Sequence, residues 1–198
     1  MKRKNSRIDH RVKYIGKPNI RLLSLNIAHA RKSTTQQLVR RKKSIYRNLD
    51  AIVHLLKREK ADIVALQEAD SPSHWSGHFD HVEYLAKKSA YNYLLQGEHV
   101  KRMFITYGTA IISHFPLKKS RSFKFFKTPL RMPKGFVITT IECPPDHSEI
   151  DVVSLHLDPI RRSVRMKQVN ELFEMLKNDD NPIVIMGDFN CDWKYKES

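Results

Sequence analysis

The amino-acid sequence predicts a mixed α/β protein in which β-sheets are stacked in layers and flanked by helices. Short apolar runs of strand length are separated by turn residues along most of the chain, and three other segments carry apolar residues at helical spacing. Several neighbouring strands follow one another without a helix between them, which favours a layered sandwich over a doubly wound parallel sheet. The sequence contains no internal repeat and no low-complexity segment.

The strand-like segments share a length of about four to twelve residues and boundaries made of Pro, Gly or charged residues. They are 20–27, 63–66, 91–95, 106–117 (TYGTAIISHFPL), 135–143 (GFVITTIEC), 149–157 (EIDVVSLHL) and 182–187 (PIVIMG).

Helices are predicted over 35–60 and 79–89, because apolar residues recur there at intervals of three and four. A third helix is predicted to start at Asp158 and Pro159 and to run to about Leu176. Asp is a favoured N-cap residue and proline fits the first turn, so this dipeptide is typical of a helix start.

The chain of 198 residues is long enough for one domain with a substantial core, and no linker rich in Pro, Gly or Ser divides it. We expect this domain to occupy residues 20–198. The preceding residues 1–19 are basic and end next to Pro18, so they are expected to form a solvated arm.

The charge is strongly positive, with 36 Lys and Arg against 21 Asp and Glu, a net charge of +15 and a sequence pI near 9.9. Such a field favours anionic partners, either nucleic acid or an acidic lipid surface. Charge alone does not choose between them, and a solvated basic surface without a specific partner explains it equally well.

The two cysteines, Cys143 and Cys191, fit no metal-ligand spacing and indicate a reducing compartment. The basic N-terminus is followed by no apolar segment of signal-peptide length, and no stretch approaches about 18 consecutive apolar residues. We therefore expect a cytoplasmic protein without a transmembrane segment.

Polar side chains stand where four of the apolar runs end, and such residues would converge on one rim if the strands lie side by side. They are Asn26, Glu68, His156 with Asp158, and Asp188 with Asn190. Carboxylate and amide oxygens with an imidazole, and no sulfur cluster, suit Mg²⁺ or Mn²⁺ better than zinc. This set is suited to phosphoryl chemistry, in which a metal neutralises phosphate oxygens while a carboxylate orients or deprotonates the attacking water.

Each of these residues also has a purely structural explanation. Asn26 could satisfy a turn, Glu68 could pair with a surface lysine, and His156 could be a hydrogen-bonded strand histidine. Asp188 could cap the turn after Gly187. Asp188 and Asn190 flank Phe189, which is expected to be buried. A turn does not require both a carboxylate and a carboxamide at these positions.

Five motifs, LSLNIAHAR, DIVALQEAD, YGTAIISHFPL, DVVSLHLD and PIVIMGDFNCDW, occur in this order. Together they resemble the successive motifs of the endonuclease/exonuclease/phosphatase superfamily, which has the deoxyribonuclease I-like fold, and in particular its bacterial metal-dependent hydrolases. The resemblance runs from about residue 20 to residue 193. It implies a four-layered α/β sandwich that hydrolyses phosphodiester or phosphomonoester bonds with a divalent metal, usually Mg²⁺.

The resemblance also implies a role for each strand-end residue. Glu68 would be the principal metal ligand, with Asn26 beside it in the metal and phosphate shell. Asp188 would position or activate the water, Asn190 would hold a phosphate oxygen, and His156 would contact the phosphate as its charge shifts.

Other positions that match the family pattern are expected to be structural. They are Gly108 with Thr109 on a supporting strand, and Arg165 with Gln168 on the following helix. Asp158 is expected to lie near the site without being catalytic.

The family pattern also contains an Asp-His pair, usually written S-D-H, on a loop well beyond GDFN, and this sequence reaches Ser198 without it. We therefore expect the last strands and this motif to be missing. Asp80-His81 and Asp146-His147 both precede GDFN, in a predicted helix and a predicted turn, so neither is read as the motif. A catalytically impaired remnant or a binding module is the alternative to an active enzyme.

Within the enzyme interpretation, the charge of +15 slightly favours a nuclease. The alternative is a phosphodiesterase directed at phospholipids or GPI lipids, because the resemblance extends to proteins of GPI-lipid remodelling. Three phenylalanines interleaved with lysines in 123–127 could touch a membrane, although an ordinary strand explains this pattern better. The natural substrate, the cleavage position and the oligomeric state are not predicted.

Overall fold

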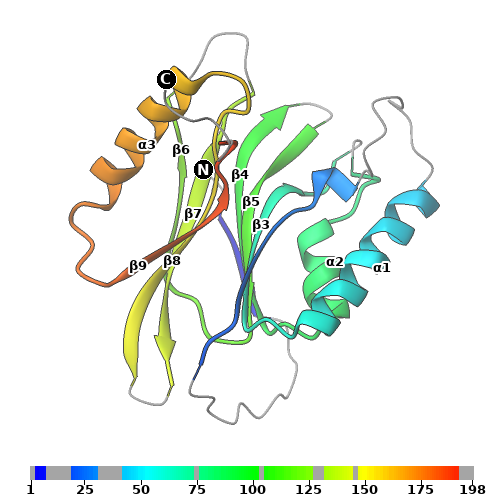
Figure 1. Cartoon of the computed structure of the whole chain (residues 1–198). Coiled ribbons are helices and arrows are strands. Elements are labelled where there is room, and N and C mark those ends of the chain that lie inside the picture. Colours follow the sequence, from blue (N-terminus) through cyan, green and yellow to red (C-terminus); the bar gives the residue numbers. More distant parts are fainter. Residues whose placement is uncertain are drawn as a thin grey trace.

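Two β-sheets face each other at the centre of the molecule, and helices cover both outer faces (Figure 1). The computed structural model describes residues 3–7, 19–30, 42–73, 76–102, 105–126, 132–144 and 147–191. In this part of the chain the layers run helix, sheet, sheet, helix, which confirms the predicted four-layered α/β sandwich.

The first sheet has five strands among the described residues, in the order β1-β4-β5-β3-β2. Its strands are β1 (Arg3–Arg7), β2 (Leu22–Asn26), β3 (Ile63–Asp70), β4 (Tyr93–Arg102) and β5 (Ile105–Ser113). The second sheet has four strands in the same part of the chain, in the order β6-β7-β8-β9. They are β6 (Lys118–Lys124), β7 (Gly135–Cys143), β8 (Ser148–His156) and β9 (Ile183–Asp188).

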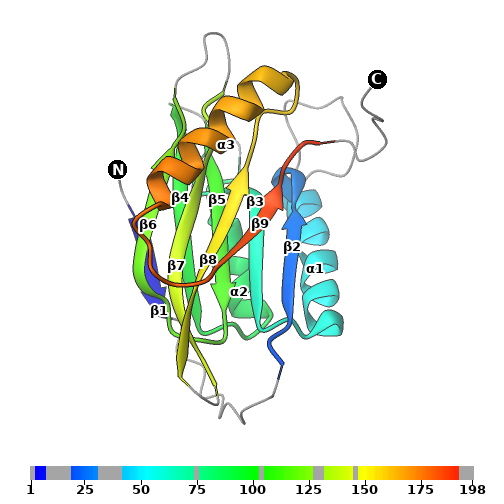
Figure 2. The same cartoon turned by 60° about the vertical axis from the view of Figure 1, so that its left-hand side comes forward.

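Helices α1 (Lys42–Glu59) and α2 (His81–Lys88) cover the first sheet, and α3 (Arg162–Leu176) covers the second (Figures 1 and 2). The side chain of Asp80 caps α2 by accepting a hydrogen bond from the backbone N–H of Glu83. No helix in the described segments is long and apolar enough to cross a membrane.

Three apolar clusters hold the four layers together. One lies between the first sheet and its helices and includes Leu49, Leu56 and Leu85. A second lies between the two sheets, and a third lies between the second sheet and α3. The central strand β3 alternates between the first two clusters, because Val64 and Leu66 belong to the helical side whereas Ile63 and Ala65 face the other sheet.

Two parallel strand pairs decide where the polar strand ends lie. β2 pairs in parallel with β3, and β8 pairs in parallel with β9. The register places Asn26 beside Gln67 in the first sheet and His156 beside Asp188 in the second. Parallel neighbours end at the same edge of a sheet, so each pair delivers two polar termini to one place.

The helix predictions over 35–60 and 79–89 are confirmed by α1 and α2, although the segment 31–41 lies outside the described residues. β4 is longer than the predicted strand 91–95 and reaches Arg102. The extension follows from its pairing with β5, which continues from Tyr93 opposite Ser113 to Arg102 opposite Ile105. Backbone pairing does not require apolar side chains, so the polar half of β4 carries no strand signal in the sequence.

Part of the segment expected to be a solvated arm is ordered as a strand. β1, at 3–7, pairs antiparallel with β4 and forms the edge of the first sheet. Its sequence RKNSR has no apolar alternation, so only the exposed backbone edge of β4 explains the pairing. Residues 8–18 lie outside the described part of the chain. The boundary at 19 between arm and domain stays a prediction.

The predicted start of the third helix at Asp158 is wrong. α3 starts at Arg162, and its N-cap Arg161 makes no side-chain capping bond. Asp158 Oδ1 instead accepts from the backbone N–H groups of Ile160 and Arg161, at 2.9 and 2.8 Å. The carboxylate therefore caps a turn that precedes the helix, a use of Asp that the sequence pattern does not distinguish from an N-cap.

The phenylalanines near β6 show no sign of a membrane-contacting loop. Phe123 is the penultimate residue of β6 and stacks on Phe136, and Phe125 is buried in the cluster under α3. Phe126 is 38 % exposed, and Lys127 lies outside the described residues. The strand interpretation therefore holds for Phe123 and Lys124, whereas Phe125 and Phe126 follow the end of β6.

A buried serine joins the two sheets directly. Ser154 Oγ on β8 donates to the carbonyl of Leu66 on β3 at 3.1 Å, and it accepts from Gln67 Nε2 at 3.2 Å. Ser154 is fully buried, so no water can replace these bonds without rearrangement of the interface.

We predict that Ser154→Ala lowers the free energy of unfolding by about 1–3 kcal/mol, because it leaves two buried polar groups of β3 without this partner. Urea unfolding followed by circular dichroism measures the change. Ser163→Ala, on the exposed face of α3, is the control and should change stability by less than about 0.5 kcal/mol. Equal effects of the two substitutions would show that the inter-sheet bonds contribute nothing.

Candidate functional site

The polar ends of β2, β3, β8 and β9 meet at one end of the facing sheets (Figure 2). His156 Nε2 lies 4.0 Å from Glu68 Oε1 and 3.9 Å from Asp188 Oδ2. Asn26 Nδ2 donates to Asp188 Oδ2 at 2.9 Å, which connects the two sheets at this point. The structure thus brings together four of the residues that the sequence singled out at strand ends.

Asp188 is held in place through both of its oxygens. Oδ2 accepts from Asn26, and Oδ1 accepts from the backbone N–H of Asn190 at 3.0 Å. The second bond is the turn cap that the sequence offered as an alternative, and the first orients the carboxylate toward the site. The side chain is 27 % exposed and remains reachable from solvent.

The two asparagines also support the local backbone. Asn26 Oδ1 accepts from the backbone N–H of Ala28 at 2.9 Å, so this residue satisfies a turn and contacts Asp188 at the same time. Asn190 Nδ2 donates to the carbonyl of Leu157 at 3.0 Å and ties the end of β9 to the end of β8. Phe189, expected to be buried, is 41 % exposed, because the chain leaves the sheet at this point.

Glu68 sits on an irregularity of β3. The register between β3 and β5 shifts between Leu66 and Ala69, and Glu68 adopts a left-handed backbone with φ of 52°. A bulge of this kind re-aims a side chain that regular alternation would place elsewhere. In the described structure the nearest partners of its carboxylate are His29 Nε2 at 3.5 Å and His156 Nε2 at 4.0 Å, and the pairing with a surface lysine is not observed.

His156 is almost fully buried and has a cation beside its ring. Lys134 Nζ lies 3.1 Å from His156 Nε2 and 3.3 Å from Nδ1. Burial first, and then the Lys134 ammonium, lowers the pKa of His156 to about 3, so the imidazole is neutral near pH 7. Burial likewise lowers the pKa of Lys134, while Glu68 and Asp188 oppose that shift. Lys134 is the first site residue that the sequence analysis missed, and only its position just before Gly135 and β7 could have indicated it.

A second group missed from the sequence lies behind Glu68. His29 Nδ1 is 2.8 Å from Asp70 Oδ1, and His29 Nε2 is 3.5 Å from Glu68 Oε2. Asp70 is the last residue of β3 and is fully buried. On its other side, Asp70 Oδ2 lies 3.6 Å from Nδ1 of the buried His81. The acidic residue two positions after Glu68 in LQEAD is the signal that could have suggested this group.

The predicted supporting residues have structural partners. Gln168 Oε1 accepts from the backbone N–H of Asp158 at 2.8 Å, and Arg165 Nη1 donates to the Asp158 carbonyl at 3.2 Å. A Cβ atom at Gly108 would lie 1.7 Å from the carbonyl oxygen of Gly97 on the neighbouring strand β4. These contacts shape the backbone around the site.

Of the two other Asp-His pairs, Asp80-His81 lies at the start of a helix, as predicted. Asp80 caps α2 and His81 is its first residue. His147 is in the turn between β7 and β8, bonded to Glu142, and Asp146 lies outside the described residues. Of these histidines, only His81 approaches the site, through Asp70.

The donor set fits a magnesium-type ion held largely by water. Within the described residues, no group of three or more His, Cys, Asp or Glu side chains is arranged to hold a metal. Mg²⁺ keeps several water ligands and is typically bound through one or two carboxylates, so it does not need such a cage. Glu68 is 25 % exposed and presents its two oxygens at the point where the sheets meet. Glu68, with Asn26 beside it, remains the predicted metal shell.

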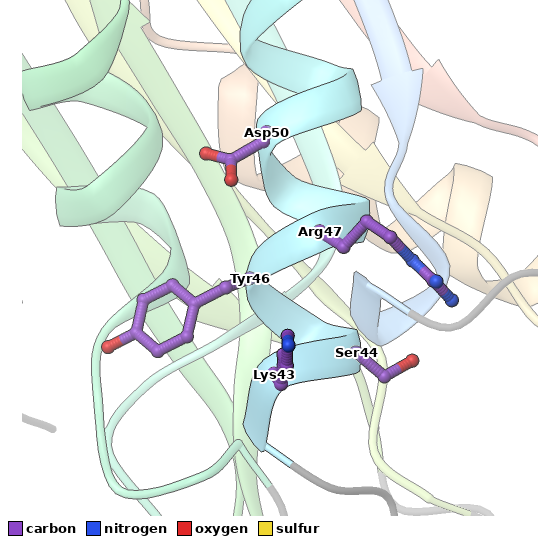
Figure 3. Close-up of a pocket in the computed structure, with 5 residues that line it drawn as sticks. All are labelled: Lys43, Ser44, Tyr46, Arg47 and Asp50. Atoms are coloured by element: carbon purple, nitrogen blue, oxygen red, sulfur yellow. The ribbon is translucent and has the colours of Figure 1, made fainter.

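A separate pocket of about 490 Å³ lies on α1 (Figure 3). It is lined by Lys43, Ser44, Tyr46, Arg47 and Asp50. None of the strand-end residues contributes to it. The first turns of α1 nevertheless lie at the same end of the molecule as the ends of β2 and β3 (Figure 1), because α1 runs back along the sheet between these parallel strands.

Comparison with protein families decides the classification of the chain. The model of the Endonuclease/Exonuclease/phosphatase family matches residues 23–196. The chain belongs to this endonuclease/exonuclease/phosphatase family. Comparison with curated proteins found no match.

Solved structures show the same fold at low sequence identity. An endonuclease/exonuclease/phosphatase family protein from Leptotrichia buccalis C-1013-b has a TM-score of 0.66 and 19 % identity, over 88 % of this chain and 67 % of that chain. The mannosyl-6-phosphatase Bt3783 of Bacteroides thetaiotaomicron VPI-5482 has a TM-score of 0.63 and 16 % identity, over 90 % and 68 %. TDP2 from D. rerio, complexed with a single-strand DNA product, has a TM-score of 0.61 and 17 % identity, over 87 % and 61 %. The chain thus spans about two thirds of the length of these structures.

A buried histidine beside the site makes the fold sensitive to acid. His99 is fully buried, and its Nε2 lies 2.8 Å from Thr109 Oγ1. Burial lowers the pKa of His99 to about 3, as it does for His156. An unfolded chain has histidine pKa values near 6.5 and therefore binds protons that the native state does not bind between about pH 3 and pH 6.5. The stabilisation is complete above about pH 6.5 and is lost as the pH falls.

We predict that the urea midpoint falls as the pH is lowered from 7.5 to 5, and that His99→Gln reduces this dependence. Gln retains a polar group for Thr109 but cannot be protonated, so one of the contributing groups is removed, while His156 and His81, whose pKa values burial also lowers, remain. His54→Gln, on the exposed side of α1, is the matched control. Identical pH slopes for the native protein and His99→Gln would contradict this assignment.

Proposed function

We propose that the chain is a divalent-metal-dependent phosphoesterase that hydrolyses a phosphodiester or phosphomonoester bond with Mg²⁺ or Mn²⁺. The observation that carries the proposal is the position of His156 Nε2, within 4.0 Å of both Glu68 and Asp188, at the meeting point of four strand ends. The family to which the chain belongs is named for nucleases and phosphatases, both of which break phosphoester bonds.

Asp188 is the group best suited to orient or deprotonate the attacking water. Its two oxygens are fixed by Asn26 and by the backbone of Asn190, so the carboxylate needs no reorganisation when a water approaches. Partial exposure lets that water reach it from solvent.

The phosphate would lie against His156 and Lys134. A neutral imidazole can donate its one N–H to a phosphate oxygen, and the half-buried ammonium of Lys134 beside the ring supplies positive charge where the transition state becomes more anionic. Asn190 stands at the same rim and is the proposed further contact for a phosphate oxygen. A divalent ion at Glu68 and Asn26 supplies charge neutralisation of the phosphate oxygens when bound.

A nucleic acid is the substrate class that the charge favours. The chain carries +15, and Lys43 and Arg47 line a pocket at the site's end of the molecule. In a nucleic acid, phosphates flanking the scissile bond would contact Lys43 and Arg47, whereas a small phosphate ester bound at the strand ends would be too short to reach them. A cytoplasmic location remains the corresponding expectation for this protein.

We predict that the purified chain hydrolyses bis(p-nitrophenyl) phosphate with Mg²⁺ or Mn²⁺, and that Glu68→Gln and Asp188→Asn each lower the rate by at least about 100-fold. EDTA should abolish the reaction. Glu174→Gln, an exposed substitution on α3, should leave the rate unchanged. A folded chain that is inactive on this ester and on DNA, RNA and phosphomonoesters would favour a binding module, and activity that survives both site substitutions would contradict the proposed roles.

We further predict that the double substitution Lys43→Ala, Arg47→Ala weakens binding of single-stranded DNA without changing hydrolysis of the small ester. Removing two phosphate contacts should reduce the slope of log affinity against log salt by about 1.4, or about 0.7 for each contact. Fluorescence anisotropy at several salt concentrations measures the slope. Lys119→Ala with Lys177→Ala, which removes two exposed cations outside the pocket, is the matched control, and an equal loss in both variants would remove the support for a nucleic-acid site at α1.

A further inference from the structure

His29 is held in a backbone conformation that L-residues rarely adopt. Ala28, His29 and Ala30 have φ values of 44°, 53° and 54°, and each such residue costs about 1–2 kcal/mol. Asn26 Oδ1 accepts from the N–H of Ala28, and Asn48 Nδ2 donates to the carbonyl of Ala30 at 2.7 Å. The fold therefore holds this strained turn at both ends, and strain of this kind clusters at functional sites.

Asp70 decides which nitrogen of His29 carries the proton. Its Oδ1 lies 2.8 Å from His29 Nδ1, and a carboxylate can only accept a hydrogen bond. Nδ1–H is therefore the donor, and in the neutral ring Nε2 is the unprotonated nitrogen. Asp70 is fully buried at the end of β3, so this orientation is fixed. A histidine that binds a metal almost always donates its other N–H to a carboxylate or carbonyl in this way.

The fixed Nε2 points at the predicted metal ligand. It lies 3.5 Å from Glu68 Oε2, which is longer than the 2.7–2.9 Å of a charge-assisted hydrogen bond. Two ligand atoms that are each about 2.1 Å from one ion lie about 3.0–3.5 Å apart, so the gap fits two ligands of a shared ion. Glu68 reaches this position through its own left-handed backbone, in the bulge of β3.

We propose that His29 Nε2, oriented by Asp70, is a nitrogen ligand that shares one divalent ion with Glu68, and that the site therefore binds Mn²⁺ more tightly than Mg²⁺. Imidazole nitrogen is a poor ligand for Mg²⁺ and a good one for first-row transition ions, whereas carboxylate oxygen serves both. The proposal rests on the proposed metal-dependent function and narrows its choice of ion.

The competing explanation is that His29 only packs the turn. Its ring contacts Tyr107 edge to face, with centroids 4.6 Å apart, and the bond to Asp70 could simply satisfy a buried carboxylate. Under that explanation His29 contributes to folding, and the affinities for Mn²⁺ and Mg²⁺ do not depend on its Nε2.

The test is direct Mn²⁺ binding by electron paramagnetic resonance, with Mg²⁺ affinity measured by competition, on the full chain without substrate. The informative variant is His29→Asn, because Asn tolerates left-handed backbone and can place an N–H donor near the position of Nδ1, yet it has no equivalent of Nε2. His147→Asn is the matched control, since His147 also has a left-handed backbone, with φ of 59°, and is exposed in the β7–β8 turn. Thermal unfolding in EDTA checks that each variant is folded.

We expect His29→Asn to weaken Mn²⁺ binding by at least about tenfold while Mg²⁺ binding changes by less than about threefold. Nitrogen couplings of bound Mn²⁺ in electron spin echo envelope modulation should be present in the native chain and absent in the variant. Unchanged Mn²⁺ affinity, or an equal loss for both ions, would overturn the proposal.

Glu68→Gln separates this outcome from failure of the proposed function. If Glu68→Gln loses both ions and His29→Asn loses neither, the nitrogen ligand is wrong and the metal site stands. If Glu68→Gln retains Mn²⁺ binding, the ion does not lie at the strand ends, and both proposals fail.

Discussion

One buried contact between the two sheets sets the geometry on which the candidate site depends. Ser154 of β8 bonds to the carbonyl of Leu66 and to the side chain of Gln67 on β3. His156 lies two residues after Ser154 on β8, and Glu68 lies two residues after Leu66 on β3. The contact therefore fixes the distance between the imidazole and the carboxylate. Parallel pairing fixes the register of β2 against β3 and of β9 against β8. The positions of Asn26 and Asp188, at the ends of β2 and β9, are therefore fixed as well. The left-handed backbone at Glu68 is held between two paired neighbours, because Gln67 pairs with Asn26 of β2 and Ala69 pairs with Gly108 of β5.

The fold could be predicted from the sequence to the extent that burial left a pattern. Strands such as β3 and β9, with a continuous apolar run, and the helix α2, with one apolar face, were recognised with errors of a few residues. The helix α1 was also recognised, and its predicted start lies outside the described residues. The predictions failed where hydrogen bonding of the backbone, rather than side-chain burial, determines the structure. β1 has no apolar residue and exists because β4 offers an edge, and Asp158 caps a turn rather than α3 because two backbone N–H groups precede the helix.

The site could be predicted where a polar residue ends a buried strand. That rule identified Glu68 and Asp188, and the parallel register explains why such residues meet. It could not identify Lys134, which precedes a strand, or His29, which lies in a loop after one. Asp70 was overlooked because a turn alone explains one acidic residue at a strand end. Its role depends on His29, which is 41 residues away in the sequence. Partners brought together by tertiary structure leave no local pattern.

The central claim is that these strand ends form one centre for a divalent ion and a phosphate. The measurement that tests it most directly is a crystal structure of the chain soaked with Mn²⁺ and inorganic phosphate, with the ion located by anomalous scattering. The account predicts an anomalous peak within coordination distance of Glu68, and phosphate density in contact with His156, Lys134 or Asn190. An ordered Mn²⁺ that lies away from Glu68, or phosphate bound only at another surface, would contradict it.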